Sequence, residues 1–129
     1  MDAAKVVNGV LEINDQCKNC GKCIGKCHFD AIPDGQQGYQ ISIGGMWGKR
    51  TQAAKPLNKL FKTPEEVYDI IEKMILLYRE QGQTGERVAQ TVNRIGFKNI
   101  EAQLLSDEIM ERKDEILNEN FHTSGGATC

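Results

Sequence analysis

Four cysteines near the amino terminus constrain this chain more than any other feature. The spacing C-x2-C-x2-C-x3-C joins Cys17, Cys20, Cys23 and Cys27. Gaps of two residues let one tight loop turn three thiolates toward a common centre, and this spacing is typical of ligands to an iron–sulfur cluster. Gly21 and Gly25 suit such a loop because glycine adopts positive φ without strain. The run therefore predicts a [4Fe-4S] site held by these cysteines.

The spacing does not decide whether the last cysteine of the run, Cys27, binds the same cluster as the other three. In two-cluster ferredoxins with this spacing, the fourth cysteine ligates the other cluster. The first three thiols would then need a ligand from outside the run, unless Cys27 closes the set locally. Three lysines lie between the cysteines and offset the charge of an anionic cluster. His28 replaces the proline that usually follows the run.

Other uses of clustered cysteines fit less well. Structural zinc sites usually place a dozen or more residues between two C-x2-C pairs, and this run has no such gap. A disulfide knot requires a secretory signal, and residues 1–16 contain no apolar signal core. Haem attachment requires C-x-x-C-H, which the segment from Cys23 to His28 exceeds by one residue. A zinc-stabilised interaction domain remains the alternative. Because the thiolate ligands occur without a secretory signal, we expect the chain to be located in the reducing cytoplasm.

Composition excludes some partners. The chain has 129 residues, a net charge of −2 and 40% hydrophobic residues, which is ordinary for a globular protein. No stretch approaches the roughly 18 apolar residues of a membrane span. Residues 49–62 contain five basic residues and no acidic one, but no interleaved aromatic residues accompany them. We therefore expect neither a nucleic acid nor a membrane as partner.

The amino-terminal half predicts short strands and loops. Asn8-Gly9 lies between β-branched residues and predicts a hairpin over 5–13. A short helical turn is expected after Cys23, ending near Asp30, with a turn at 33–35. Alternation over 38–43 predicts a strand. Residues 49–62 are expected to form a basic loop.

The carboxyl-terminal half predicts helices. Thr63, Pro64 and Glu66 form the start signal of a helix that ends at Gly82. Further helices are expected over 85–95 and 107–118. The predicted class is α+β: half of a ferredoxin-like unit with a hairpin, one further strand and a mainly helical second half. The predicted segments are an iron–sulfur module at 1–37, the strand and Gly-Gly loop at 38–62, helices at 63–120 and a flexible tail at 121–129.

Two shortfalls suggest that the chain belongs to something larger. The strand at 38–43 has no obvious partner downstream, and unpaired strand edges leave backbone groups without hydrogen bonds. The cysteine run lacks one ligand if Cys27 points elsewhere. We therefore expect either a segment of a longer protein or a subunit that another chain completes.

The segment from Tyr39 to Arg50 resembles a known family. It reads Tyr-Gln-Ile-Ser-Ile-Gly-Gly-Met-Trp-Gly-Lys-Arg, and after a ferredoxin-type cysteine run it is similar to the carboxyl-terminal part of sirohaem nitrite/sulfite reductases, in their anaerobic and dissimilatory-type branch. The resemblance covers about residues 5–105. It continues through Glu65-Glu66-Val67, Ile71-Glu72-Lys73, Tyr78-Arg79-Glu80, Gly85-Glu86-Arg87 and Arg94-Ile95-Gly96-Phe97.

This resemblance implies an electron-transfer module that relays single electrons through a [4Fe-4S] cluster to sirohaem, which only the complete enzyme would hold. The family's upstream sirohaem-cluster cysteines have no counterpart here, so the chain alone is not expected to be catalytic. Its partner would be the remainder of the reductase or a partner redox subunit. The alternatives are a stand-alone ferredoxin-like carrier and the zinc-stabilised domain.

The resemblance also implies sirohaem contacts after the strand. Lys49 and Arg50 could meet sirohaem carboxylates or an anionic substrate, because arginine binds carboxylates in a bidentate fork; a solvated basic loop is the alternative. Gly44 and Gly45 would let the backbone approach a flat macrocycle, although such glycines also simply make turns. Trp47 is expected to be a packing anchor.

Overall fold

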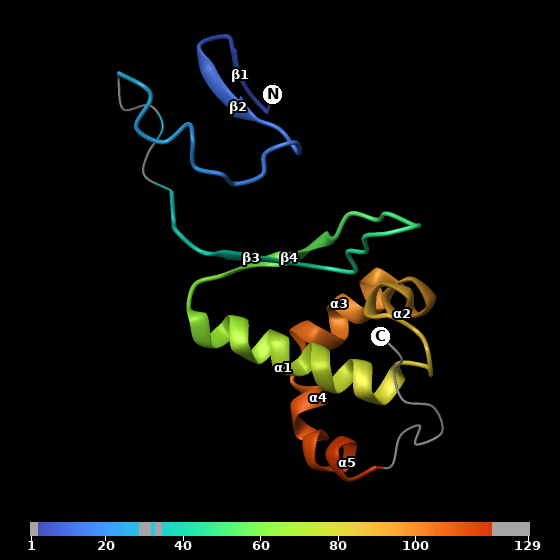
Figure 1. Cartoon of the computed structure of the whole chain (residues 1–129). Coiled ribbons are helices and arrows are strands. Elements are labelled where there is room, and N and C mark those ends of the chain that lie inside the picture. The colour runs from blue at the N-terminus through green and yellow to red at the C-terminus, as the bar shows by residue number, and fades with distance from the viewer. Residues whose placement is uncertain (1–2, 29–31, 33–34, 120–129) are drawn as a thin grey trace. The chain divides into compact units, whose positions relative to one another are not determined.

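A computed structural model describes residues 3–28, 32 and 35–119 (Figure 1). The chain divides into two compact units, residues 1–37 and 38–129. Among the described residues, the first unit contains a hairpin and the cysteine loop, and the second contains two strands followed by five helices. The α+β class is therefore confirmed. The predicted tail at 121–129 and the predicted turn at 33–35 lie mostly outside the described residues.

The amino-terminal hairpin forms where the sequence predicts it. β1 (Ala4–Val7) pairs antiparallel with β2 (Val10–Ile13). Asn8 and Gly9 join the strands with φ of 51° and 81°, the left-handed conformation that a two-residue hairpin turn requires. None of the described residues in this unit is buried, and an isolated two-stranded hairpin is only marginally stable in water. The unit therefore needs a further source of stability.

The strand predicted at 38–43 has a partner within the chain, so the expectation of an unpaired strand is wrong. β3 (Tyr39–Ile43) pairs antiparallel with β4 (Lys55–Phe61), inside the segment predicted to be a basic loop. The register shifts between Gln40 and Ser42. β4 buries only Leu57 and Phe61, which are four residues apart. The two lie on one face of the strand, but Lys59 between them is exposed, so the alternation that identifies a strand is incomplete.

The first helix, α1 (Pro64–Gln81), confirms the predicted start signal. The backbone N–H of Glu66 donates to the Thr63 side chain at 3.4 Å, and the Glu66 carboxylate accepts from the N–H groups of Thr63 at 3.3 Å and Lys62 at 2.7 Å. These backbone hydrogen bonds lower the pKa of Glu66 below its ordinary value. α1 contacts β3, β4 and each of the other helices, so it is the central element of the unit.

The remaining helices are α2 (Val88–Ile95), α3 (Phe97–Leu105), α4 (Glu108–Glu111) and α5 (Lys113–Asn118). α2 lies inside the range predicted at 85–95 and ends at Gly96 as expected. α3 was not predicted, and it begins directly after the same glycine. The single helix predicted over 107–118 is interrupted at Arg112. Over the described residues, no helix is both long and apolar enough to cross a bilayer.

The core of the second unit lies between the sheet and the helices. Its largest fully buried side chain is Phe61, from β4. The buried apolar residues are Leu57, Phe61, Ile70, Leu76, Leu77, Ala89, Val92, Ile100, Leu104, Ile109 and Ile116. Lys73 of α1 is 3% exposed and reaches Asp69 at 2.9 Å and Asp107 at 2.8 Å. Burial would lower the pKa of Lys73, but the hydrogen bonds to both carboxylates outweigh it and raise that pKa.

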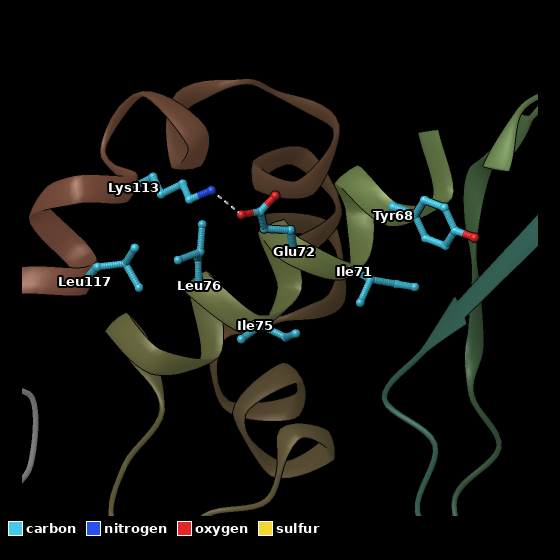
Figure 2. A pocket seen from close by; sticks show the side chains of 7 residues that line it. All are labelled: Tyr68, Ile71, Glu72, Ile75, Leu76, Lys113 and Leu117. Carbon is cyan, nitrogen blue, oxygen red and sulfur yellow. Dashed lines mark ion pairs between the residues drawn. The ribbon is translucent and has the colours of Figure 1, made fainter. Parts of the chain in front are cut away.

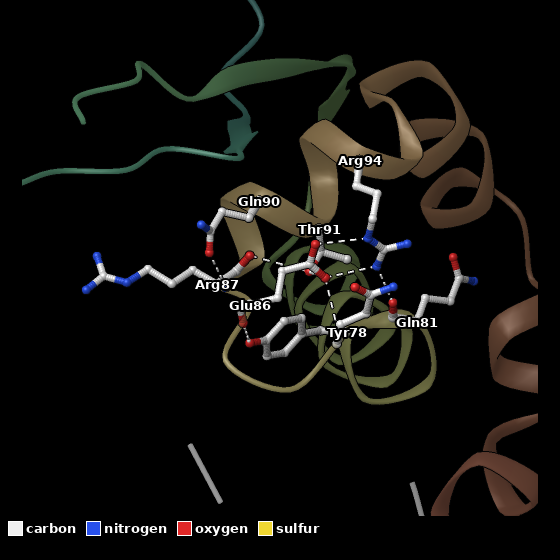
Figure 3. A network of polar contacts seen from close by, with 8 residues as sticks. Tyr78, Gln81, Glu86, Arg87, Gln90, Thr91 and Arg94 are labelled. Carbon is white, nitrogen blue, oxygen red and sulfur yellow. Dashed lines mark hydrogen bonds and ion pairs between the residues drawn. The ribbon is translucent and has the colours of Figure 1, made fainter. Parts of the chain in front are cut away.

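A polar network fixes the connection between α1 and α2 (Figure 3). Glu86 and Arg94 face each other, with Nε and Nη2 of Arg94 each 2.9 Å from a carboxylate oxygen of Glu86. The buried Thr91 hydroxyl donates to the same carboxylate at 2.9 Å. The Tyr78 hydroxyl donates to the Glu86 carbonyl. Chiefly because Arg94 donates to it, the pKa of Glu86 is lowered to about 2.

Candidate metal centre

The cysteine loop is shaped by local backbone hydrogen bonds. The N–H of Cys17 donates to the carbonyl of Asn14 at 3.0 Å, immediately after β2. Two tight turns follow, in which Ile24 N–H donates to the carbonyl of Gly21 at 3.1 Å and Lys26 N–H to that of Cys23 at 3.3 Å. Residues 22–25 thus form turns, and the helical turn predicted after Cys23 is absent from the described residues up to 28.

Three residues of the loop adopt positive φ. Gly21 and Gly25 have φ of 69° and 67°, as predicted for glycines between cluster ligands. Asn19 has φ of 50°, and its side-chain oxygen lies 3.8 Å from the sulfur of Cys17. Asparagine is among the residues that tolerate this conformation. The backbone therefore turns sharply at each gap between the first three cysteines and again before Cys27.

The four thiols remain accessible. Cys20 is exposed, the other three are partly exposed, and the structure forms no disulfide among these four. Among the described residues, no group of three or more Cys, His, Asp or Glu side chains is close enough to hold one metal ion. The donor set fits an iron–sulfur cluster by its chemistry, because soft thiolates are the preferred ligands of such clusters. Binding requires the loop to bring the thiols together.

The Gly-Gly segment after β3 is closely packed. A Cβ atom on Gly44, which has φ of 75°, would lie 3.2 Å from Cγ1 of Val92 in α2. A Cβ atom on Gly45 would lie 3.1 Å from that of Ala54. Both glycines therefore let their backbone approach neighbouring elements of the same unit. Close packing within the chain is therefore one reason for glycine at both positions.

Residues 46–52 form a small closed loop between β3 and β4, which we call the 46–52 finger. Met46 and Gln52 exchange backbone hydrogen bonds of 2.9 and 2.8 Å at its base. Lys49 and Arg50 lie exposed beyond this base. Trp47 is 85% exposed, so its prediction as a packing anchor within this chain is wrong.

The sequence did not indicate the residues that anchor the finger. Gln52 Nε2 donates to the carbonyl of Gly44 at 2.8 Å. Gln52 and Asn93 of α2 also pair through their side-chain amides, at 2.8 and 3.2 Å. Forty-one residues separate the two amides. Neither lies in a recognisable motif, so no local signal could have identified the pair.

The described residues also form a shallow apolar groove of about 350 Å³ on α1 and α5 (Figure 2). Lys113 and Glu72 form an ion pair of 2.5 Å beside it. The groove is lined by Tyr68, Ile71, Glu72, Ile75, Leu76, Lys113 and Leu117. It contains no cysteine and none of the predicted sirohaem contacts, so the predicted chemistry is not located there.

Comparison with known proteins decides the family. The family profile described as "Nitrite and sulphite reductase 4Fe-4S domain" matches residues 12–113, which include the whole cysteine run. The chain belongs to this family. The match also includes β3, β4 and most of the helices, so the second unit is part of the family domain as well as the cysteine loop.

Two curated relatives carry the same kind of name. The chain is 34% identical over 76 residues to the "Sulfite reductase [NADPH] hemoprotein beta-component" of Bacillus velezensis, which covers 52% of this chain and 13% of the relative. It is 32% identical over 85 residues to the protein of that name in Bacillus subtilis strain 168, covering 57% of the chain and 14% of the relative. The matched segments thus span about one-seventh of each relative.

Proposed function

We propose that this chain is the electron-relay segment of a sirohaem-dependent sulfite or nitrite reductase, and that Cys17, Cys20, Cys23 and Cys27 hold a [4Fe-4S] cluster. The observation that carries the proposal is the cysteine run itself, placed inside a match to the family's 4Fe-4S domain. When bound, such a cluster accepts and donates one electron at a time. Assignment to the anaerobic and dissimilatory-type branch is also part of the proposal; it rests on the segment from Tyr39 to Arg50 alone, since both relatives are named as NADPH-type components.

The chain's own residues would bind the cluster and influence its reduction potential. The positive φ values at Asn19, Gly21 and Gly25 turn the backbone between the thiols, so backbone N–H groups can approach the sulfur atoms. Hydrogen bonds to sulfur and solvent exposure are the main means by which a protein sets a cluster's potential. The lack of buried residues in residues 3–28 suggests that cluster binding also supplies much of this unit's stability.

The finer assignments extend the proposal to the complete enzyme. We propose that Lys49 and Arg50 can reach anionic groups, including sirohaem carboxylates, because both side chains are exposed. The roles of Gly44 and Gly45 would be indirect, through the packing that positions this segment. The remainder of the reductase, or a partner redox subunit in a reducing cytoplasm, would supply sirohaem and the substrate site.

Anaerobic reconstitution with iron and sulfide tests the proposal. We expect about four iron and four sulfide per chain, and a reducible cluster signal in electron paramagnetic resonance. Stoichiometric zinc without iron uptake would instead support the zinc-stabilised interaction domain. A chain that forms the cluster and exchanges electrons without any reductase component would support the stand-alone carrier.

Single substitutions then assign the ligands. Cys20→Ser should abolish cluster assembly, because a hydroxyl is a poor substitute for a soft thiolate. Cys27→Ser should also lose iron if Cys27 closes the ligand set within this chain, and should retain iron if that thiol serves another cluster. Cys129→Ser is the matched control, since it makes the same chemical change outside the run. Full iron content in Cys20→Ser would contradict the assignment.

A further inference from the structure

One face of the amino-terminal hairpin, drawn in blue in Figure 1, is wholly apolar. Side chains alternate between the two faces of a sheet, and directly paired residues share a face. The register therefore gathers four apolar residues on one side: Ala4, Val6, Leu11 and Ile13. The opposite face is mixed, because it carries the Lys5–Glu12 pair. Val6 is 71% exposed and Ile13 is 54% exposed, so the apolar face is largely uncovered within the described chain.

The hairpin needs a second surface against this face. A two-stranded hairpin alone is only marginally stable in water, and packing of a hydrophobic face against further strands stabilises it. None of the first unit's described residues is buried, so this unit supplies no such packing itself. Residues 3–28 contain four lysines and two acidic residues, a net charge of +2, which an anionic cluster offsets. Two copies of the unit can therefore meet without strong repulsion.

The cysteine run requires a second run of the same kind. In two-cluster ferredoxins with this spacing, the fourth cysteine ligates the other cluster. Here the backbone reverses between Cys23 and Cys27, through the turn that the Lys26 N–H closes at 3.3 Å and the positive φ of Gly25. The 129 residues contain one such run. A second copy of the chain contains the second run that this arrangement requires.

We propose that two copies of this chain pair through the apolar faces of their hairpins and exchange Cys27. Each [4Fe-4S] cluster is then held by three thiolates of one copy and by Cys27 of the partner subunit. A two-fold axis satisfies both exchanges at once, because each copy in an isologous pair gives what it receives. This inference rests on the proposed cluster site and specifies the source of its fourth ligand.

Pairing should depend on the cluster. The apolar face of one hairpin offers at most a few hundred Å², whereas stable protein interfaces bury about 1,200–2,000 Å² in total. The hairpin faces alone are therefore too small to hold a stable pair. Two exchanged thiolates add iron–sulfur bonds across the interface, and a ligand that binds only the paired state shifts the equilibrium toward it. The chain should be a monomer without iron and a dimer after reconstitution.

Sedimentation equilibrium before and after anaerobic reconstitution measures this dependence. All samples carry Cys129→Ser, which prevents a disulfide between two copies of that residue. We expect the mass of one chain without iron, and of two chains with about eight iron per pair after reconstitution. Val6→Gln places an amide in the apolar face and should raise the dissociation constant of the reconstituted pair at least tenfold. Val7→Gln makes the same change on the mixed face and should alter that constant less than about twofold; equal effects would contradict pairing through the apolar face.

Mixing two variants that each lack part of the ligand set tests the exchange itself. Cys27→Ser keeps the first three thiols, whereas the triple variant Cys17→Ser, Cys20→Ser, Cys23→Ser keeps only Cys27 of the run. In a mixed pair, the triple variant supplies its Cys27 to the Cys27→Ser chain. With an affinity tag on the triple variant, we expect Cys27→Ser to copurify with it only after reconstitution, with about four iron per mixed pair. Each variant alone should hold less iron, and circular dichroism checks that the helices of each remain folded.

Three results would overturn the exchange. The first is a reconstituted parent that is a monomer with four iron, because Cys27 would then close the ligand set within one chain. The second is a mixture that takes up no more iron than its separate components. The third is a Cys27→Ser variant with the iron content of the parent, which would place the fourth ligand outside the pair. In all three cases a parent that holds a cluster still supports the electron relay, whereas a parent that takes up no iron contradicts the relay as well.

Discussion

Replacing Gly44 by alanine tests whether close packing holds the base of the finger. Gly44 has φ of 75°, and a new Cβ would lie 3.2 Å from Cγ1 of Val92, which is only 2% exposed. Gly85 provides a matched control: it has the same φ of 75°, and a Cβ there would meet nothing within 4 Å. The two substitutions share the backbone strain and differ in the steric contact.

The expected losses in the free energy of unfolding follow from the backbone strain and from the steric contact with Val92. A left-handed conformation costs a residue with a Cβ about 1–2 kcal/mol, and reduced freedom of the unfolded chain offsets about 0.4–1 kcal/mol of this. Gly85→Ala should therefore lower the free energy of unfolding by about 1 kcal/mol. Overpacking against Val92 adds about 1–3 kcal/mol, so Gly44→Ala should lose about 2–4 kcal/mol.

Urea unfolding followed by far-ultraviolet circular dichroism measures both losses, because all the described helices belong to the second unit. The midpoint should shift further for Gly44→Ala than for Gly85→Ala, with little change in the slope. Equal shifts in the two variants would show that Val92 can move away without cost. The packing account of Gly44 would then be refuted.

Two further predictions concern ionised groups. Because Arg94 lowers the pKa of Glu86 from 4.5 to about 2, the stability from the ionised carboxylate should be complete above about pH 4.5 and lost as the pH falls toward 2. Urea midpoints between these pH values should fall less in Glu86→Gln, and an equal fall would contradict the assignment. Lys73→Met should lower the free energy of unfolding by about 1–3 kcal/mol, because it removes the charge-assisted hydrogen bonds from the ammonium group to Asp69 and Asp107. Lys113→Met breaks an exposed pair and should cost less than about 1 kcal/mol; a larger loss there than at Lys73 would contradict this ranking.

The elements predicted correctly are those whose sequence signal lies within a few neighbouring residues. Asn8-Gly9 determines its turn through the φ values of two residues. Thr63 and Glu66 determine the start of α1 through hydrogen bonds between positions three apart. Such contacts depend little on the rest of the fold.

The missed elements depend on distant contacts. β4 contains Pro56 and buries only Leu57 and Phe61, with the exposed Lys59 between them, so its alternation of apolar and polar residues is incomplete. α3 starts at Phe97 with no side-chain cap, since Gly96 both ends α2 and precedes α3. The i, i+3, i+7 spacing of Phe97, Ile100 and Leu104 is nevertheless a helical signal for α3 that the sequence prediction missed.

In the candidate site, too, the features with local sequence signals were predicted and those that depend on tertiary packing were not. The run from Cys17 to Cys27 identifies the chemistry of the donor set, because spacing and residue type are local. The exposure of Trp47 and the amide pair that anchors the finger depend on how β3, β4 and α2 pack, so sequence patterns could not indicate them.

Iron and acid-labile sulfide analysis with electron paramagnetic resonance, carried out on the anaerobically reconstituted chain and its Cys20→Ser variant, tests the central claim most directly. We predict about four iron and four sulfide per chain with a reducible signal in the parent, and neither in the variant. Equal iron in both proteins, or zinc in place of iron in the parent, would contradict a cluster held by these thiols.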